Sequence, residues 1–141
     1  MNGLLVDTNV LSELARPRPS PAVVAFLNAA PIETLYLSDL VLAEIRFGLE
    51  TTTDLTRRAR IDTWLNSFVR PHFADRILAL TENILVRWRI MKEVGQRAGY
   101  TSPEPDLLIA ATASHHGLTI LTRDVEPFER AKVAVLNPWD K

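Results

Sequence analysis

Short apolar runs alternate with longer segments of helical periodicity along most of this 141-residue chain. This alternation predicts an α/β fold, in which helices pack on a mostly parallel sheet. The runs that we expect to form strands are Leu4–Val6, Leu35–Leu37, Ile77–Leu80, Thr119–Leu121 and Val133–Leu136. The segments that we expect to form helices are 9–15, 21–30, 39–50, 55–69, 82–98 and 105–116. The loop-like segments 16–21 and 51–54 are too short for linkers, so we expect a single domain over residues 1–141.

Two aspartates lie near the ends of expected strands. Asp7 directly follows the run Leu4–Val6, and Asp124 comes shortly after Thr119–Leu121. In open parallel sheets, ligands bind at the carboxyl ends of the strands, so both side chains are candidates for a functional site. A turn or a helix cap is the more common role of a single aspartate at such a place, and that structural alternative stays open for each.

Two further acids belong to expected helices. Glu44 falls within the apolar face of its helix, because Val41 and Phe47 are three residues away on either side. Such a carboxylate needs a partner that offsets its desolvation, and a buried arginine is the structural alternative to a ligand. Asp106 lies in the first turn of segment 105–116, which is apolar on every side. At that place an aspartate can either cap the helix or face a site.

The four carboxylates repel one another if they converge at one end of the sheet. Two like charges about 4 Å apart cost roughly 4 kcal/mol at an effective dielectric near 20. A hard divalent cation removes this repulsion, whereas an unneutralised group would take up protons or destabilise the fold. The chain has no cysteine and three histidines, and oxygen ligands alone suit Mg²⁺ or Mn²⁺ rather than zinc. A site of this kind supports phosphoryl chemistry.

The middle of the chain is basic, although the formal net charge is −1. Residues 55–99 carry nine Lys and Arg against four Asp and Glu. Such a segment is either a solvated helical surface or a surface that binds a polyanion. The residues that we consider for contacts with the phosphate backbone of such a polyanion are Arg57, Arg58, Arg60, Arg87, Arg89 and Lys92. The sequence has no glycine-rich phosphate loop and no nucleophile elbow, which argues against nucleoside triphosphate hydrolysis and serine hydrolysis.

Four sequence segments together resemble a known family. They are LLVDTNVLSEL at 4–14, LSDLVLAEIRFGLE at 37–50, PDLLIAATA at 105–113 and LTRD at 121–124. Each segment alone is weak evidence, but their order and spacing over nearly the whole chain resemble those of PIN-domain ribonucleases, and within them the FitB-like VapC-type toxins. The resemblance implies a PIN-like α/β fold, with a central parallel sheet of four to five strands flanked by helices.

The resemblance also implies roles for individual residues. The family holds Mg²⁺ or Mn²⁺ with an acidic quartet, which is matched here by Asp7, Glu44, Asp106 and Asp124. Thr8 and Thr122 match polar positions beside the first and last acids, where a hydroxyl either orients a carboxylate or serves in ordinary capping. Glu104 and Asp39 are acids beyond the family pattern, and helix capping is the role that we favour for both.

For function, the resemblance implies a Mg²⁺- or Mn²⁺-dependent endoribonuclease that is the toxin of a type II toxin–antitoxin module. The six basic candidates would then contact the RNA backbone. It further implies a homodimer and a VapB-type antitoxin with a segment that crosses the acidic pocket. Two other interpretations remain: a non-catalytic RNA-binding or assembly module that kept the fold, and a Mg²⁺-dependent phosphatase with Asp7 as nucleophile. The second of these is weaker, because the phosphatase motif has another aspartate where this chain has Asn9.

No apolar stretch of the sequence approaches the length of a membrane-spanning helix, which needs roughly 18 residues or more. The first residues run directly into an apolar segment, without the basic region and small-residue pattern of a secretory signal. We therefore expect a soluble cytoplasmic protein.

Overall fold

Residues 3–139 are described by the computed structural model, in which five short strands form one sheet. The strands are β1 Leu4–Val6, β2 Leu35–Ser38, β3 Ile77–Leu78, β4 Thr119–Leu121 and β5 Val135–Leu136. Their order across the sheet is β3-β2-β1-β4-β5, and every neighbouring pair is parallel. The predicted α/β fold with a parallel sheet is therefore confirmed. The two edge strands are each two residues shorter than predicted, because pairing stops before Ala79 and starts only after Ala134.

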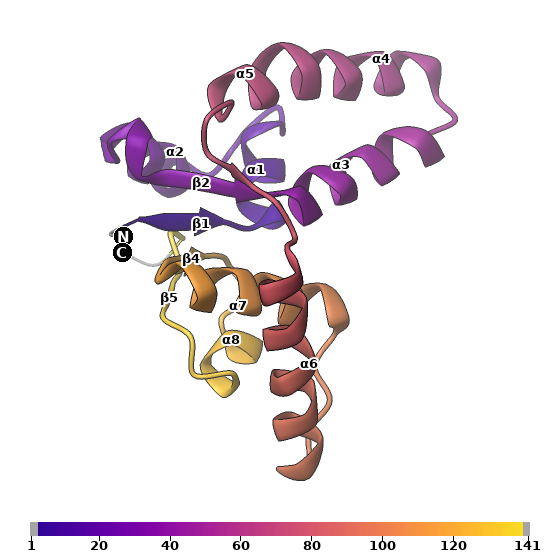
Figure 1. The fold of residues 1–141 in the computed structure, drawn as a ribbon. Helices are drawn as coiled ribbons and strands as arrows, with labels where there is room; N and C mark the ends of the chain where they lie inside the picture. The colour runs from indigo at the N-terminus through magenta and orange to yellow at the C-terminus, as the bar shows by residue number, and fades with distance from the viewer. Residues whose placement is uncertain (1–2, 140–141) are drawn as a thin grey trace.

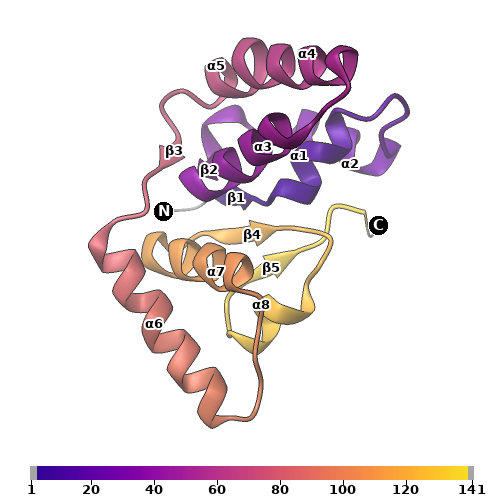
Figure 2. The same ribbon diagram turned by 90° about the vertical axis from the view of Figure 1, so that its right-hand side faces the viewer.

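Helices fill the connections between the strands and lie on both sides of β1. Figures 1 and 2 show α1 to α5 on one side of this central strand and α6 to α8 on the other. The α-helices are α1 Thr8–Leu14, α2 Pro21–Ala29, α3 Asp39–Thr51, α4 Leu55–Trp64, α5 Arg70–His72, α6 Glu82–Arg97, α7 Glu104–His116 and α8 Glu126–Arg130. A 3-10 turn, η1, covers Ile32–Thr34, and a π-helical turn, η2, covers Leu65–Val69. None of the helices within residues 3–139 is long and apolar enough to cross a membrane.

The helix predicted over 55–69 is helical but changes its geometry midway. The α-helical part ends at Trp64, the wider π-helical turn follows, and α5 continues the helical path. Leu65 and Val69 of the π-helical turn are buried in the core. A π-helical turn has hydrogen bonds between residues i and i+5, so it holds more residues per turn than an α-helix does. The turn therefore changes which residues face inward, a change that apolar periodicity alone could not predict.

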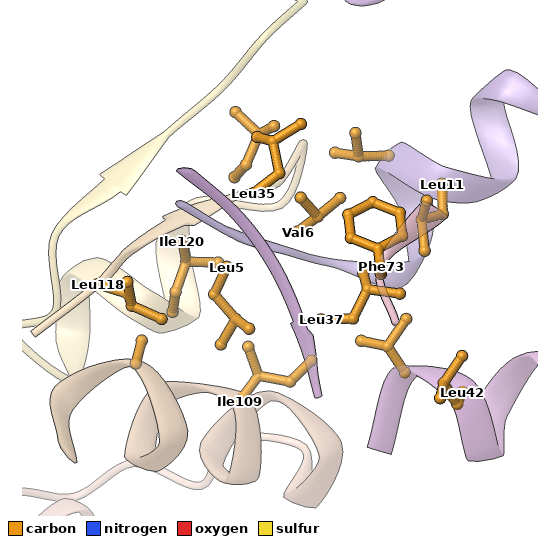
Figure 3. Packing of buried hydrophobic residues seen from close by; sticks show 14 of the residues in the cluster. Leu5, Val6, Leu11, Leu35, Leu37, Leu42, Phe73, Ile109, Leu118 and Ile120 are labelled. Atoms are coloured by element: carbon orange, nitrogen blue, oxygen red, sulfur yellow. The ribbon is translucent and has the colours of Figure 1, made fainter. Parts of the chain in front are cut away.

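The hydrophobic core lies on both faces of β1. Leu5 and Val6 are consecutive strand residues, so their side chains point to opposite faces, and both are fully buried. Figure 3 shows Leu5 on the side of Ile109 from α7, and Val6 on the side of Phe73 and Leu11. Burial of both faces is usual for a central parallel strand covered by helices. It fixes β1 firmly, and with it the position of the residue that follows.

Candidate active site

Asp7 follows β1, and two hydrogen bonds fix its carboxylate. The backbone N–H of Thr8 donates to Oδ1 at 2.7 Å, and the Thr122 hydroxyl donates to Oδ2 at 2.9 Å. Burial raises the pKa of Asp7; the bonds from Thr122 and Thr8 oppose that rise, and the charges of Glu44 and Asp124 add to it. Asp7 is the N-cap of α1, so the capping role and a place beside other acids both hold for this residue.

Thr122 is fully buried and joins the end of β4 to the end of β1. Besides donating to Asp7, its hydroxyl oxygen accepts from the Asn9 amide and from the Asp124 backbone N–H, both at 3.1 Å. The Asn9 side-chain oxygen in turn accepts from the Arg123 N–H at 3.2 Å. These bonds hold the loop that carries Asp124 against the start of α1. Sequence reasoning missed Asn9 as a site residue, and its only sequence signal is a position two residues after a strand-end acid.

Glu44 reaches the same place from α3. Its Oε1 accepts a hydrogen bond from the Thr8 hydroxyl at 2.8 Å, so Thr8 connects α3 to the start of α1. No arginine pairs with Glu44 among residues 3–139, which argues against a buried arginine as its partner. Phe47, which was predicted to share the apolar face, is 70% exposed, whereas Val41 and Ile45 are buried. The buried face of α3 is therefore narrower than predicted, and Glu44 lies half-buried at its edge.

Asp106 enters the site from the first turn of α7. Burial, followed by the charges of Asp7, Asp124 and Glu44, raises the pKa of Asp106 from 3.8 to about 6. Neither α7 nor α8 has a side-chain cap, so the capping alternatives for Asp106 and Asp124 are wrong. The structure thus brings the four predicted acids close enough for their charges to act on one another, and they come from four separate parts of the chain.

The donors of this site suit a hard cation. They are carboxylates; burial, and after it the charges of neighbouring acids, raise the pKa of Asp7 and of Asp106, and a bound cation would relieve that repulsion. Within residues 3–139, no three Asp, Glu or His side chains already form a metal-binding cluster. Mg²⁺ keeps several of its waters and needs only one or two carboxylates, at about 2.0–2.1 Å. The arrangement therefore fits such a cation without a preformed cage.

The two acids beyond the family pattern have other roles. α7 begins at Glu104, which pairs with Lys92 of α6 at 2.7 Å. The hydrogen bond and charge of Lys92 lower the pKa of Glu104. Asp39 is exposed in the first turn of α3, where Ser38 supplies the cap. Neither side chain caps its helix, so the capping prediction is wrong, although both carboxylates lie where the helix dipole favours negative charge.

The three basic candidates of α4 lie in different surroundings. Arg57 and Arg60 are exposed, and their guanidinium groups have no ion pair or hydrogen bond within the described part of the chain. Arg58 donates to the backbone oxygens of Leu49 at 3.1 Å and Glu50 at 3.3 Å, and it pairs with the Glu50 carboxylate at 3.0 Å. Arg58 therefore caps the C-terminal end of α3, and its charge is paired with the Glu50 carboxylate.

The basic candidates of α6 also have partners. Arg87 donates to the Ser114 hydroxyl at 3.0 Å, and Lys92 holds Glu104, so both residues tie α6 to α7. The Arg89 guanidinium lies 5.8 Å from the Trp88 ring centroid. Among the six candidates, the two exposed arginines of α4 are thus the cations that are freest to meet a polyanion.

Comparison with known proteins agrees with this fold. Residues 4–134 match the family described as "PIN domain". The chain therefore belongs to the PIN-domain family, and the predicted PIN-like fold is confirmed. Within that family it is similar to VapC-type toxins, including the FitB protein that the sequence resemblance indicated.

Three relatives illustrate this similarity. The chain is 38% identical to VapC ribonuclease Y4jK of Sinorhizobium fredii, over 97% of this chain and 98% of that protein. It is also 38% identical to Toxin FitB of Neisseria gonorrhoeae, over 96% of this chain and 98% of that protein. The crystal structure of FitAcB from Neisseria gonorrhoeae matches with a TM-score of 0.92 and 37% identity, over 98% of this chain and 99% of that chain.

Proposed function

We propose that this chain is a Mg²⁺- or Mn²⁺-dependent endoribonuclease and the toxin of a type II toxin–antitoxin module. The observation that carries the proposal is the convergence of Asp7, Glu44, Asp106 and Asp124, with the pKa of Asp106 raised to about 6 partly by the other three. Two relatives that align along nearly the whole chain support it, one named a VapC ribonuclease and the other a toxin.

In this proposal Asp7, Glu44 and Asp106 hold one or two cations, with help from Asp124. A bound cation neutralises phosphate oxygens and makes water a better nucleophile at neutral pH. The chain itself supplies orientation, because Thr8 fixes both Asp7 and Glu44, and Thr122 fixes Asp7. The phosphatase interpretation is weaker, because Asn9 stands where the phosphatase motif has its second aspartate.

We further propose a VapB-type antitoxin as partner, together with homodimerisation and action on RNA in the cytoplasm. The carboxylate site can also bind a cationic side chain. An Arg or Lys of the antitoxin that enters the site would replace the charge of the cation and so block it. We also propose that residues 1–141 act as a single PIN domain, since the family match extends from residue 4 to residue 134.

The test is cleavage of a pooled cellular RNA preparation by the purified protein in Mg²⁺, Mn²⁺ or EDTA. Asp106→Asn is the inactive variant, because it keeps the shape of the side chain and removes its charge. Asp39→Asn is the matched control, because it removes an exposed acid outside the pocket. We expect fragments from wild type and Asp39→Asn in the presence of either metal, and none from Asp106→Asn or in EDTA.

Other outcomes separate the competing interpretations. Equal cleavage by all three proteins indicates a contaminating nuclease. Retention of RNA by a folded wild-type protein, without cleavage in either metal, supports the non-catalytic RNA-binding module. Release of phosphate from a phosphomonoester, with covalent labelling of Asp7, supports the phosphatase.

A further inference from the structure

A pocket of about 520 Å³ adjoins the carboxylate site and shares two residues with it. Thr8 and Glu44, which are joined by a 2.8 Å hydrogen bond, form part of its lining. The other lining residues come from α1, α3, α4 and the loop after α1. Any molecule in this pocket therefore lies next to the place where the proposed reaction occurs. The volume is within the range of about 300–1,000 Å³ that is typical of small-ligand sites.

The wall of the pocket opposite α1 is aromatic and aliphatic, and its rim is cationic. Ile61 and Trp64 line it from α4, and Arg57 and Arg60 belong to the same face of that helix. The two arginines are exposed and have no ion pair among residues 3–139. Arg16 also lines the pocket, but Glu13 already pairs with it at 3.2 Å. An apolar wall with free guanidinium groups at its rim is complementary to a flat base flanked by phosphates.

Gly48 provides an independent indication that the pocket receives a ligand. It lies inside α3, where glycine is unfavourable compared with alanine, and it lines the pocket. A Cβ atom added at Gly48 would meet nothing within 4 Å. Packing within the chain therefore gives no reason for a glycine at this position of α3, and the glycine keeps the α3 side of the pocket open.

We propose that this pocket binds one unpaired base of the RNA substrate, beside the scissile phosphate, with Arg57 and Arg60 contacting the flanking phosphates. The inference rests on the proposed RNA substrate and adds the way in which that substrate is held. The base must be unpaired, because bases within a duplex are stacked and cannot enter an apolar pocket. Because Gly48 has no side chain, it leaves space for the base in the pocket. The protein therefore binds single-stranded regions of RNA in preference to duplex regions.

The test compares two labelled probes in EDTA, so that binding is measured without cleavage. One is a ten-nucleotide RNA of random sequence, and the other is an abasic ten-unit oligomer with the same ribose-phosphate backbone. We expect wild type to bind the RNA about tenfold more tightly, the preference that stacking of one base typically gives. Gly48→Leu fills the pocket and should reduce this preference to about twofold or less. Ala43→Leu adds the same side chain at an exposed position of α3 and should keep the preference.

Two further measurements keep the test decisive. If Gly48→Leu does not fold, Trp64 fluorescence in a Trp88→Phe, Trp139→Phe protein replaces it, and the RNA but not the abasic oligomer should quench it. Arg57→Gln and Arg60→Gln should weaken binding of both probes alike, because they act on phosphates.

Equal affinity of wild type for the two probes, or an unchanged preference in folded Gly48→Leu, would overturn the assignment. If that variant keeps its RNA preference but escapes inhibition by a co-expressed antitoxin, the pocket binds a protein segment instead. A wild-type protein that prefers RNA but never cleaves it contradicts the proposed function and leaves the pocket assignment standing.

Discussion

Replacing Asp106 by asparagine should stabilise the metal-free protein while removing its proposed activity. The pKa of Asp106 is raised from 3.8 to about 6 by burial and by the charges of three other acids. The folded state therefore binds this proton more tightly than the unfolded state does, so ionisation costs stability. The cost is absent below about pH 3.8, grows as the pH rises to about 6, and stays constant above that. Asparagine cannot ionise and avoids the cost.

The size of the effect follows from the difference between the two pKa values. One pKa unit corresponds to about 1.4 kcal/mol, which gives an upper limit of about 3 kcal/mol above pH 6. Asp106 is only partly buried, and solvent screens its interactions, so we expect about 1–2 kcal/mol. For a chain of this size, that corresponds to an increase in Tm of about 3–7 °C.

Urea unfolding at pH 8 and at pH 4, with EDTA and with Mg²⁺, tests this expectation. In EDTA at pH 8 the variant should be the more stable protein, and at pH 4 the two should be nearly equal. Added Mg²⁺ should stabilise wild type more than the variant, because a ligand stabilises the state that binds it. Asp39→Asn, which removes an exposed acid, should show no gain. The reasoning is refuted if Asp106→Asn gives no gain at pH 8, or if its gain persists at pH 4.

Three further substitutions test separate parts of the site. Asn9→Ala removes the hydrogen bonds to Thr122 and Arg123. We expect the free energy of unfolding in urea to fall by about 1–2 kcal/mol and cleavage to be slower. Unchanged stability and rate would show that these bonds are not needed to hold the loop. Thr8→Val removes the hydroxyl that holds Glu44 and should raise the Mg²⁺ concentration for half-maximal cleavage about tenfold. Thr8→Ser keeps a hydroxyl and should return that concentration to the wild-type value. Equal Mg²⁺ titrations of wild type and Thr8→Val would contradict this role. Arg57→Gln should reduce the slope of log RNA affinity against log salt concentration by about one. Arg58→Gln, which loses its bonds to α3, should lower stability and leave that slope unchanged. Equal salt slopes for the two variants would contradict this division.

The sequence allowed the acids of the site to be predicted because their positions follow from local rules. Asp7 and Asp124 lie just beyond two strands, and β1 and β4 turned out to be neighbours in the sheet. Helical periodicity identified Glu44 as a candidate. The exposure of Phe47 shows that the buried face of α3 is narrower than the periodicity predicted. Strand ends and helix faces depend on short stretches of chain, which is why the places of these acids in the fold follow from sequence, while their roles stay a proposal.

Other features depend on partners that are distant in sequence, and these were not predicted. Asn9 bonds to Thr122, 113 residues away. Arg58 was considered for RNA contacts, but it closes the end of α3 because α4 folds back beside that helix. The π-helical turn after Trp64 buries Leu65 and Val69 in the core, which is formed by several other elements. Side-chain partners of this kind exist only after the elements have packed, so no pattern within one segment reveals them.

The hydrogen bond between Thr122 and Asp7 joins residues 115 positions apart. β1, whose end carries the first acid, is completed on one side only when β4 is added. A chain interrupted before β4 lacks Thr122 and Asp124, leaves one edge of β1 unpaired, and loses one of the two hydrogen bonds that fix Asp7. Under the proposed function, incomplete translation products and fragments cut ahead of β4 would therefore lack a complete site. The proposed toxicity would begin only when synthesis is nearly finished, which gives an inhibitor the whole period of translation in which to be ready.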